Sequence, residues 1–250
     1  EPFSRREEVQ ALADAAGCGE KLEWQPPFGG EEAKDSPFWY VNLPTEADAK
    51  FIASRSVLVK GIYDLWGEGT TWEDLEASVK QTPADRKDPY TSEQAVFKIA
   101  IEGFGHTVPH KQQMQYIKQL EFIDFKGPVD LKNPQYTFHL IETANKGHNN
   151  GLFANVPKRF YFGRELGSGD RSPMSKYNLS SRSYIGPTSM DVELCMLMCN
   201  QGGVKKGDLV YDPFVGTGSI LVAASHFGAV TIGADIDIRV VRDGKTNKRG

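Results

Sequence analysis

The sequence predicts a chain of mixed class, with an α+β region first and the start of a Rossmann-like α/β domain last. Of its 250 residues, 39% are hydrophobic and 25% are charged, which is the composition of an ordinary globular protein. Strand-like and helix-like segments alternate through the first half. Residues 209–235 then read as one β-loop-α-β unit, the repeating element of a doubly wound parallel sheet.

Composition also excludes several classes of protein. No window approaches the roughly 18 uncharged apolar residues of a membrane helix, and the first residues lack the pattern of a secretory signal. Cys18, Cys195 and Cys199 have no disulfide-framework spacing, so we expect small buried thiols, no metal site, and a cytoplasmic protein. The net charge of −4 excludes a histone-like protein, but local basic stretches at 158–182 and 239–250 keep RNA binding open.

The first part of the chain predicts short elements separated by turns. Polar residues with Pro83 and Pro89 predict a domain boundary over 81–92. Thr45 is a good helix cap, and Trp66 reads as a core anchor rather than a base-stacking platform. Strands are expected over 37–43, 56–63, 95–101 and 138–141, and helices over 45–52, 72–79 and 110–120.

The last part carries the clearest pattern. An apolar helix is expected over 191–200, with Thr188 and Ser189 before it as its cap. A strand over 209–211 then enters a glycine-rich loop, a helix follows over 219–227, and a second strand over 229–234 ends at Asp235.

The glycine-rich loop brings backbone close to a ligand at a helix N-terminus. A nucleotide-hydrolysing P-loop needs a lysine, whereas here Gly218 is followed by Ser219. A dinucleotide loop needs a third glycine, but residue 221 is leucine. The loop from Asp212 to Gly218 (DPFVGTG) instead resembles motif I of the S-adenosylmethionine-dependent methyltransferases that act on amino groups of nucleic acids.

This resemblance implies the cofactor and the residues that hold it. In such enzymes the glycine turn lies against the amino-acid part of S-adenosylmethionine, and an acid at the end of the second strand bonds the ribose. Asp235, 17 residues after Gly218, matches that acid. The resemblance further suggests that Thr188 and Ser189 contact the cofactor carboxylate, although helix capping explains them equally well. The implied cofactor-binding residues are Asp212, Pro213, Phe214, Gly216, Thr217, Gly218, Asp235, Thr188 and Ser189.

The resemblance covers most of the chain. The segments 182–191 (RSYIGPTSMD), 162–167 (FGRELG) and 64–67 (DLWG) look like parts of the THUMP-containing tRNA methyltransferases, specifically the eukaryotic tRNA guanine-10 N2-methyltransferase. It implies a tRNA substrate and a small zinc-binding activator subunit. The expected domains are an α+β domain over 1–84, a THUMP RNA-binding module over 85–158, a linker over 159–178, and the start of the methyltransferase domain over 179–250.

The family's catalytic Asp/Asn-Pro-Pro-Tyr motif is expected well after the second strand, and it does not occur in these 250 residues. We therefore expect a fragment or a trimmed sequence, with its catalytic residues unknown. Residues 88–90 (DPY) lack the second proline. Residues 133–136 (NPQY) would suit a circularly permuted enzyme, but they precede a strand and have glutamine in place of proline.

Two alternative functions stay open. Another DNA or RNA amino-methyltransferase would carry the same motif I and would differ in what its N-terminal region recognises. A non-catalytic tRNA-binding protein could retain the loop without turnover.

Overall fold

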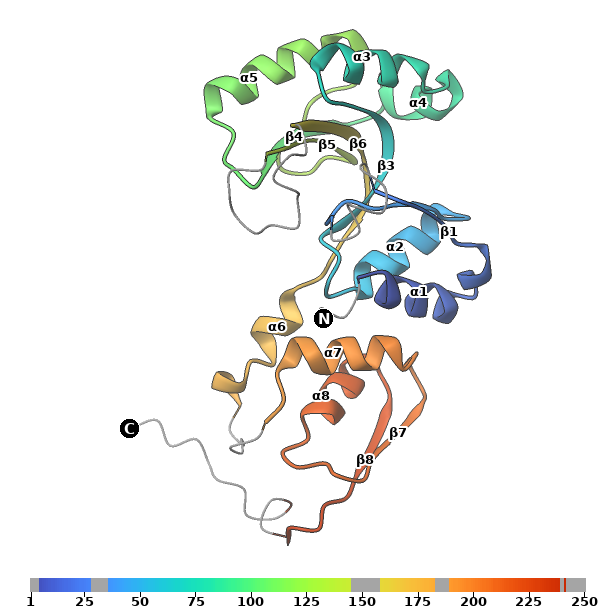
Figure 1. Cartoon of the computed structure of the whole chain (residues 1–250), viewed down its shortest axis with the longest axis vertical. Helices are drawn as coiled ribbons and strands as arrows, with labels where there is room; N and C mark the ends of the chain where they lie inside the picture. The colour runs from blue at the N-terminus through green and yellow to red at the C-terminus, as the bar shows by residue number, and fades with distance from the viewer. Residues whose placement is uncertain (1–4, 28–35, 145–157, 183–188, 239–240, 242–250) are drawn as a thin grey trace. The chain divides into compact units, whose positions relative to one another are not determined.

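The computed structural model describes residues 5–27, 36–144, 158–182, 189–238 and 241, and their contacts divide the chain into two units (Figure 1). The sheet unit consists of Glu23–Asn42 and Tyr63–Leu166, and the glycine-loop unit consists of Glu1–Leu22, Leu43–Ile62 and Gly167–Gly250. Within the described ranges, no helix has both the length and the hydropathy needed to cross a membrane.

The sheet unit is organised around four strands. Their bounds are β3 Gly61–Gly69, β4 Phe97–Phe104, β5 Tyr136–Thr143 and β6 Arg159–Ser168, in the spatial order β3-β6-β5-β4. β4 and β5 are parallel, whereas β5 and β6 are antiparallel. A separate antiparallel pair joins β1, Glu23–Gln25, to β2, Tyr40–Asn42.

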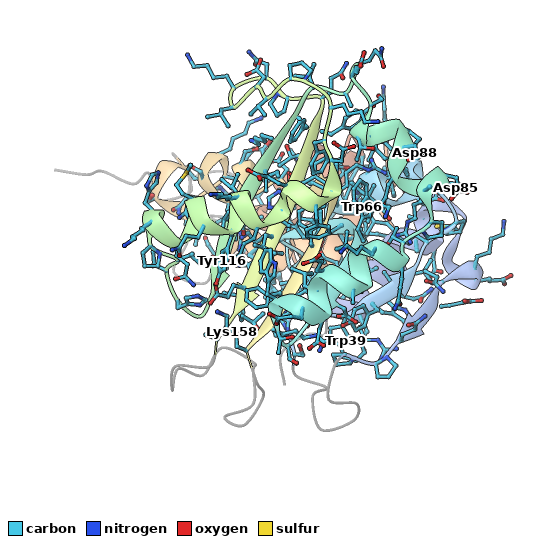
Figure 2. The ribbon with its side chains drawn as sticks, turned by 90° about the horizontal axis from the view of Figure 1, so that it is seen from above. Trp39, Trp66, Asp85, Asp88, Tyr116 and Lys158 are labelled. Atoms are coloured by element: carbon cyan, nitrogen blue, oxygen red, sulfur yellow. The ribbon has the colours of Figure 1, made fainter. Side chains whose placement is uncertain are left out.

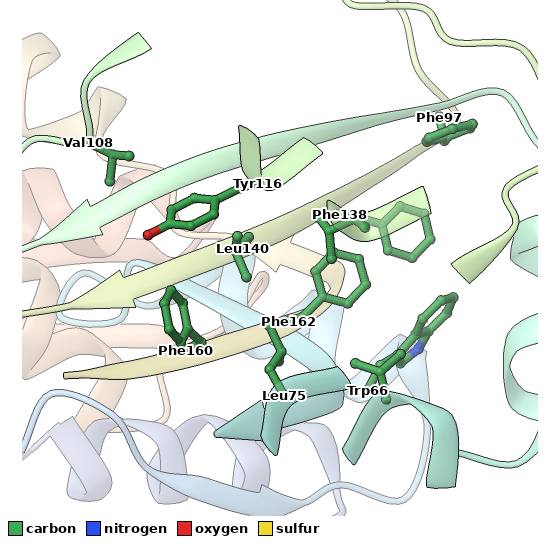
Figure 3. Packing of buried hydrophobic residues seen from close by; sticks show 11 residues of the cluster. Trp66, Leu75, Phe97, Val108, Tyr116, Phe138, Leu140, Phe160 and Phe162 are labelled. Carbon is green, nitrogen blue, oxygen red and sulfur yellow. The ribbon is translucent and has the colours of Figure 1, made fainter. Parts of the chain in front are cut away.

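Helices cover one face of this sheet (Figure 1). They are α3 Trp72–Gln81, α4 Ala84–Thr91 and α5 His110–Gln119, followed by the 3-10 turn η3 Leu120–Ile123. Trp66, Phe138 and Phe162 pack beneath them (Figure 3), and Trp66 is 2% exposed. The prediction that Trp66 anchors the core is confirmed. On β5, His139 lies between the buried Phe138 and Leu140 and so points to the opposite face, where its ring nitrogens bond Glu102 at 2.9 Å and Glu165 at 3.0 Å.

The glycine-loop unit combines segments that are far apart in the sequence. Its elements are α1 Arg5–Ala16, η1 Gly19–Lys21, α2 Glu46–Arg55, α6 Ser172–Lys176, η4 Leu179–Ser181, α7 Val192–Gln201, β7 Leu209–Asp212, α8 Ser219–His226 and β8 Val230–Gly233. β7 and β8 are parallel and α8 connects them, so the expected β-loop-α-β unit is confirmed. Its apolar core includes Val57, Cys195, Met196, Leu197 and Ala224.

A fully buried carboxylate links the first helix of the glycine-loop unit to the rest. Glu8 of α1 accepts backbone N–H bonds from Val57 at 2.9 Å and from Leu58 at 3.0 Å, and a hydroxyl bond from Ser56. Asn200 of α7 donates its amide to the same carboxylate at 2.9 Å. These bonds tie α1 and α7 to the turn that follows α2.

This carboxylate also explains why one predicted strand starts late. The apolar run 56–63 predicts a strand, yet β3 begins only at Gly61. The backbone donors of Val57 and Leu58 bond the Glu8 side chain rather than a neighbouring strand. A side chain 49 and 50 residues away from these two donors in the sequence therefore determines the local conformation.

Two other expectations are wrong in detail. The predicted boundary 81–92 contains helix α4, because Pro83 precedes its first turn and Pro89 lies near its end. Helix α7 is capped by Asp191, which accepts from the Glu193 N–H at 2.8 Å, rather than by Ser189, and Thr188 lies outside the described residues. Thr45 does cap α2, accepting from the Asp48 N–H at 3.1 Å as predicted.

The two units also divide the chain differently from the four regions expected on sequence grounds. Residues Glu1–Leu22 belong with Gly167–Gly250, and β6 extends to Ser168 within the expected linker 159–178. The mixed class itself is confirmed.

The core of the sheet unit predicts a large effect for one substitution. Phe138→Ala should lower the free energy of unfolding of this unit by about 3–5 kcal/mol, because the fully buried ring leaves a cavity. Urea unfolding followed by tryptophan fluorescence measures this change. Leu131→Ala is the control, because Leu131 is 74% exposed and its loss should alter stability by at most about 0.5 kcal/mol. Equal effects of the two variants would contradict this assignment of the core.

Candidate functional site

The glycine-rich loop connects the end of β7 to the start of α8. Gly216 has a φ of +49° and Gly218 a φ of +78°, a region that side-chain-bearing residues rarely adopt. Gly218 is the N-cap of α8, so the loop enters the helix through a left-handed residue. The two glycines are therefore required by the turn itself.

Asp212, at the end of β7, organises the first half of the loop. Its Oδ1 accepts the Phe214 N–H at 2.9 Å, and its carbonyl accepts the Ala234 N–H at 2.9 Å. Val215 donates its N–H to the Ala234 carbonyl at 2.9 Å. The loop is thus bonded to the end of the neighbouring strand β8. Pro213 and Phe214 are exposed, Phe214 to 86%.

Asp235 lies beside the glycine turn. Its Oδ2 accepts the Gly216 N–H at 2.9 Å, and its Oδ1 accepts the Asp237 N–H at 2.9 Å. Each carboxylate oxygen has two lone pairs, so Asp235 can still accept from a pair of ligand hydroxyls. The structure thus brings the acid and the glycine turn together.

Two residues that precede α7 also reach the loop. Ser189 Oγ lies 2.8 Å from Thr217 Oγ1. Arg182 donates from Nη2 to the Thr217 carbonyl at 2.6 Å and from Nη1 to Ser219 Oγ at 2.9 Å. Thr188, the neighbour of Ser189 in the predicted site, lies outside the described residues. Of the predicted cofactor-binding residues, all but Thr188 gather at this loop.

Sequence reasoning did not single out Arg182 as a loop contact. The only available signal was an arginine at the start of the segment 182–191 that resembles the family. Residues 88–90 lie at the end of α4, and residues 133–136 lie just before and at the start of β5. Both of these motif-like segments belong to the sheet unit, whereas the glycine loop belongs to the other unit.

Lys158, the first cation of the predicted RNA-binding stretch 158–182, is paired inside the sheet unit. It contacts the carboxylate of Glu142 and donates to the Tyr116 hydroxyl at 3.2 Å, and Tyr116 and Lys158 are labelled in Figure 2. Burial favours a higher pKa for Glu142, but hydrogen bonds from Lys158 and Tyr116 outweigh it and hold that pKa below its usual value. Lys158 therefore pairs with the buried carboxylate of Glu142.

The next two cations of that stretch are paired as well. Arg159 Nη2 lies 2.9 Å from Glu68 Oε2, and Arg164 Nη2 lies 3.6 Å from Asp64 Oδ2. Both arginines are buried. Internal acids therefore pair with the first three cations of this stretch, and a role for the stretch in RNA binding stays a prediction. Most of the other stretch, 239–250, lies outside the described residues.

Two family models match the chain. Residues 1–171 match a model described as Tmrp11 THUMP N-terminal domain, and residues 180–250 match a model described as RMKL-like, methyltransferase domain. Residues 172–179, which follow β6, lie between the two matches.

Curated relatives match almost the whole chain. The proteins named tRNA (guanine(10)-N(2))-methyltransferase TRMT11 are 37% identical over 246 residues in Bos taurus and 38% identical over 229 residues in Homo sapiens. These matches cover 98% and 89% of this chain. A Saccharomyces cerevisiae tRNA (guanine(10)-N(2))-methyltransferase is 36% identical and covers 95%. The chain spans about half the length of these relatives, from 49% to 53%.

Among solved structures, TrmN from Thermus thermophilus aligns over 74% of this chain and 51% of its own, at 16% identity and a TM-score of 0.37. PH1313 from Pyrococcus horikoshii aligns over 92% of this chain and 75% of its own, at 13% identity and a TM-score of 0.39. Similarities at this level support no inference about the site.

The burial of the three cysteines predicts that they react slowly with thiol reagents. Cys18, Cys195 and Cys199 are buried, and burial raises the pKa of Cys195 and of Cys199 to about 11. Little thiolate therefore exists at pH 8, and we expect the native protein to react with a disulfide reagent far more slowly than free cysteine. Thiol titration should give three fast equivalents only after unfolding in guanidinium. Fast reaction of the native protein would contradict the packing role of these thiols.

Proposed function

We infer the function of this chain from its family: it belongs to the Tmrp11 THUMP N-terminal domain family, and we propose that the natural protein carrying it methylates tRNA. The proposed reaction transfers a methyl group from S-adenosylmethionine to the exocyclic N2 of the guanine at position 10. The relatives named for this reaction, at 36–38% identity, support the proposal.

The observation that carries the proposal is the contact between the DPFVGTG loop and Asp235. A glycine turn at the N-terminus of α8 lets backbone approach a ligand, and the carboxylate of Asp235, just after β8, accepts the Gly216 N–H of that turn at 2.9 Å. This arrangement suits a ligand with an amino-acid end and a ribose end. S-adenosylmethionine has both.

The residues present fit this cofactor. We propose that Gly216, Thr217 and Gly218 would contact its amino-acid part and that Asp235 would accept from its ribose hydroxyls. Phe214 would offer an exposed aromatic face close by. When bound, the cofactor would supply a methyl group attached to a sulfonium sulfur. Transfer of this methyl group to the amine leaves the sulfur as a neutral thioether, and the amine loses a proton.

We assign no catalytic residue within the described ranges. An exocyclic amine is a poor nucleophile because its lone pair is delocalised into the base, so its hydrogens must be held and its lone pair aimed at the methyl. In the family this task falls to the Asp/Asn-Pro-Pro-Tyr motif, which these 250 residues do not contain.

The further partners follow from the same family. We propose tRNA as the substrate and a small zinc-binding activator subunit as the partner of the natural protein. The three free cysteines suit a reducing compartment, and we propose the cytoplasm.

The experiment that tests this function measures methyl transfer by the natural full-length protein with its activator. Radiolabel from S-adenosylmethionine should appear in guanine N2 of tRNA and not in duplex DNA. Methylation of DNA instead would favour a different amino-methyltransferase. Tight tRNA binding with no turnover would favour a non-catalytic protein.

One prediction concerns the cofactor. Asp235→Ala in the full-length protein should weaken S-adenosylmethionine binding about ten- to hundredfold, since a charged acceptor contributes roughly 1.5–3 kcal/mol. Isothermal titration calorimetry measures the affinity. Asp237→Ala is the matched control, because its backbone N–H still donates to Asp235 and the loop contact remains. Unchanged affinity in Asp235→Ala would contradict the assignment of this acid.

A second prediction concerns RNA. Helix α5 contains no acidic residue and presents exposed Lys111 and Lys118 seven residues apart on one face, whereas α4 carries Asp85 and Asp88 (Figure 2). We therefore expect α5 to contact phosphates. Lys118→Glu should weaken tRNA binding and lower the slope of log affinity against log salt by about one.

The control is Lys80→Glu on α3, which changes charge equally at a lysine already paired with Glu76. Lys80→Glu should change the slope of log affinity against log salt less than Lys118→Glu does. Filter binding at several salt concentrations gives both slopes, and equal slopes for the two variants would exclude α5 as the contact.

A further inference from the structure

Arg182 reaches the glycine loop from outside the β-loop-α-β unit. It follows the 3-10 turn η4 and lies 30 residues before the loop begins at Asp212. Its guanidinium donates to the Thr217 carbonyl at 2.6 Å and to the Ser219 hydroxyl at 2.9 Å. The two acceptors lie on either side of Gly218, the residue with a φ of +78°.

These bonds hold the peptide group between Thr217 and Gly218 from both sides. A trans peptide points its carbonyl and its N–H in opposite directions. The carbonyl accepts from Arg182, while the N–H of Gly218 donates to the Val215 carbonyl at 2.7 Å. Rotating this peptide would break both bonds.

Such a restraint matters because glycines occur on both sides of Thr217. Glycine populates positive and negative φ almost equally, so a peptide group beside one reorients at low cost. Hydrogen bonds to a charged donor are the stronger kind, and a guanidinium bonds two acceptors with fixed geometry. Arg182 therefore restrains a loop that Gly216 and Gly218 would otherwise leave flexible.

We propose that Arg182 is a positioning residue for the cofactor site, fixing the orientation of the Thr217–Gly218 peptide before the ligand binds. This proposal rests on the proposed function, because it assumes that the loop receives S-adenosylmethionine. Arg182 acts through the loop backbone, so its loss should affect the free protein as well as the affinity.

The first measurement needs no cofactor. In the full-length protein, Arg182→Ala should raise hydrogen exchange in peptides covering residues 213–221, by about tenfold for the loss of a bond to a charged group. Arg171→Ala is the matched control, since Arg171 is also in the glycine-loop unit and pairs with Glu193 at an exposed site 2.9 Å away. It should leave exchange in the loop unchanged.

The second measurement is calorimetric titration with S-adenosylmethionine, well below the melting temperature. Arg182→Ala should weaken binding by about tenfold. Ser219→Ala removes one acceptor only and should weaken it about two- to threefold. In the Arg182→Ala background, Ser219→Ala should have little further effect, because the two groups act through one bond. Arg182→Lys should recover part of the affinity, since one ammonium cannot span both acceptors.

The outcomes separate this proposal from the proposed function. Unchanged loop exchange and unchanged affinity in Arg182→Ala overturn the positioning role while the wild-type protein still binds. The positioning role is also overturned if the loss of affinity in Arg182→Ala is explained by a lowered melting temperature alone and Arg182→Lys restores the affinity fully. If Arg182→Ala does not fold, Ser219→Ala and Arg182→Lys are combined instead, and losses of affinity that simply add overturn the proposal. Failure of the wild-type protein to bind S-adenosylmethionine overturns the proposed function, whereas the exchange measurement still decides whether Arg182 restrains the loop.

Discussion

The glycine-loop unit depends on one buried carboxylate. Glu8 is 0% exposed and accepts bonds from Ser56, Val57, Leu58 and Asn200. An unsatisfied buried polar group costs about 1–3 kcal/mol. Each of these donors therefore needs an acceptor, and the Glu8 carboxylate needs donors to replace the water that it loses on burial. The carboxylate can be buried only because α1, the turn after α2, and α7 come together around it.

This constraint extends to the glycine loop through the core. Val57, whose N–H bonds Glu8, packs in the same apolar cluster as α7 and α8. Arg55 donates to the side chain of Asn200 at 3.0 Å, and its guanidinium lies 3.8 Å from the centre of the Phe227 ring, just after α8. The helix that receives the loop thus rests on segments from the first 60 residues. The two family matches, 1–171 and 180–250, therefore do not coincide with the two compact units of the structure.

The sequence predicted features whose causes are local. The cap at Thr45, the glycine turn and the strand-helix-strand order around it depend on residues within a few positions of one another. The acid at Asp235 follows from the resemblance to motif I together with its distance in sequence from Gly218. Features set by distant residues could not be predicted. The run 56–63 looks like a strand, but Glu8 captures its backbone donors. Lys158 and Arg159 look like a basic stretch, but Glu142 and Glu68 neutralise them across the sheet unit. Likewise, α4 forms in the segment where Pro83 and Pro89 predict a domain boundary.

The most direct test of this account is hydrogen exchange in α7 and α8 after removal of the Glu8 carboxylate. Glu8→Ala leaves four donors without their acceptor, and we expect exchange in both helices to accelerate strongly relative to the wild-type protein. Glu7→Ala, at the exposed neighbouring position of the same helix, should leave that exchange unchanged. If α7 and α8 retain wild-type protection in Glu8→Ala, the buried carboxylate does not hold this unit together and the account is contradicted.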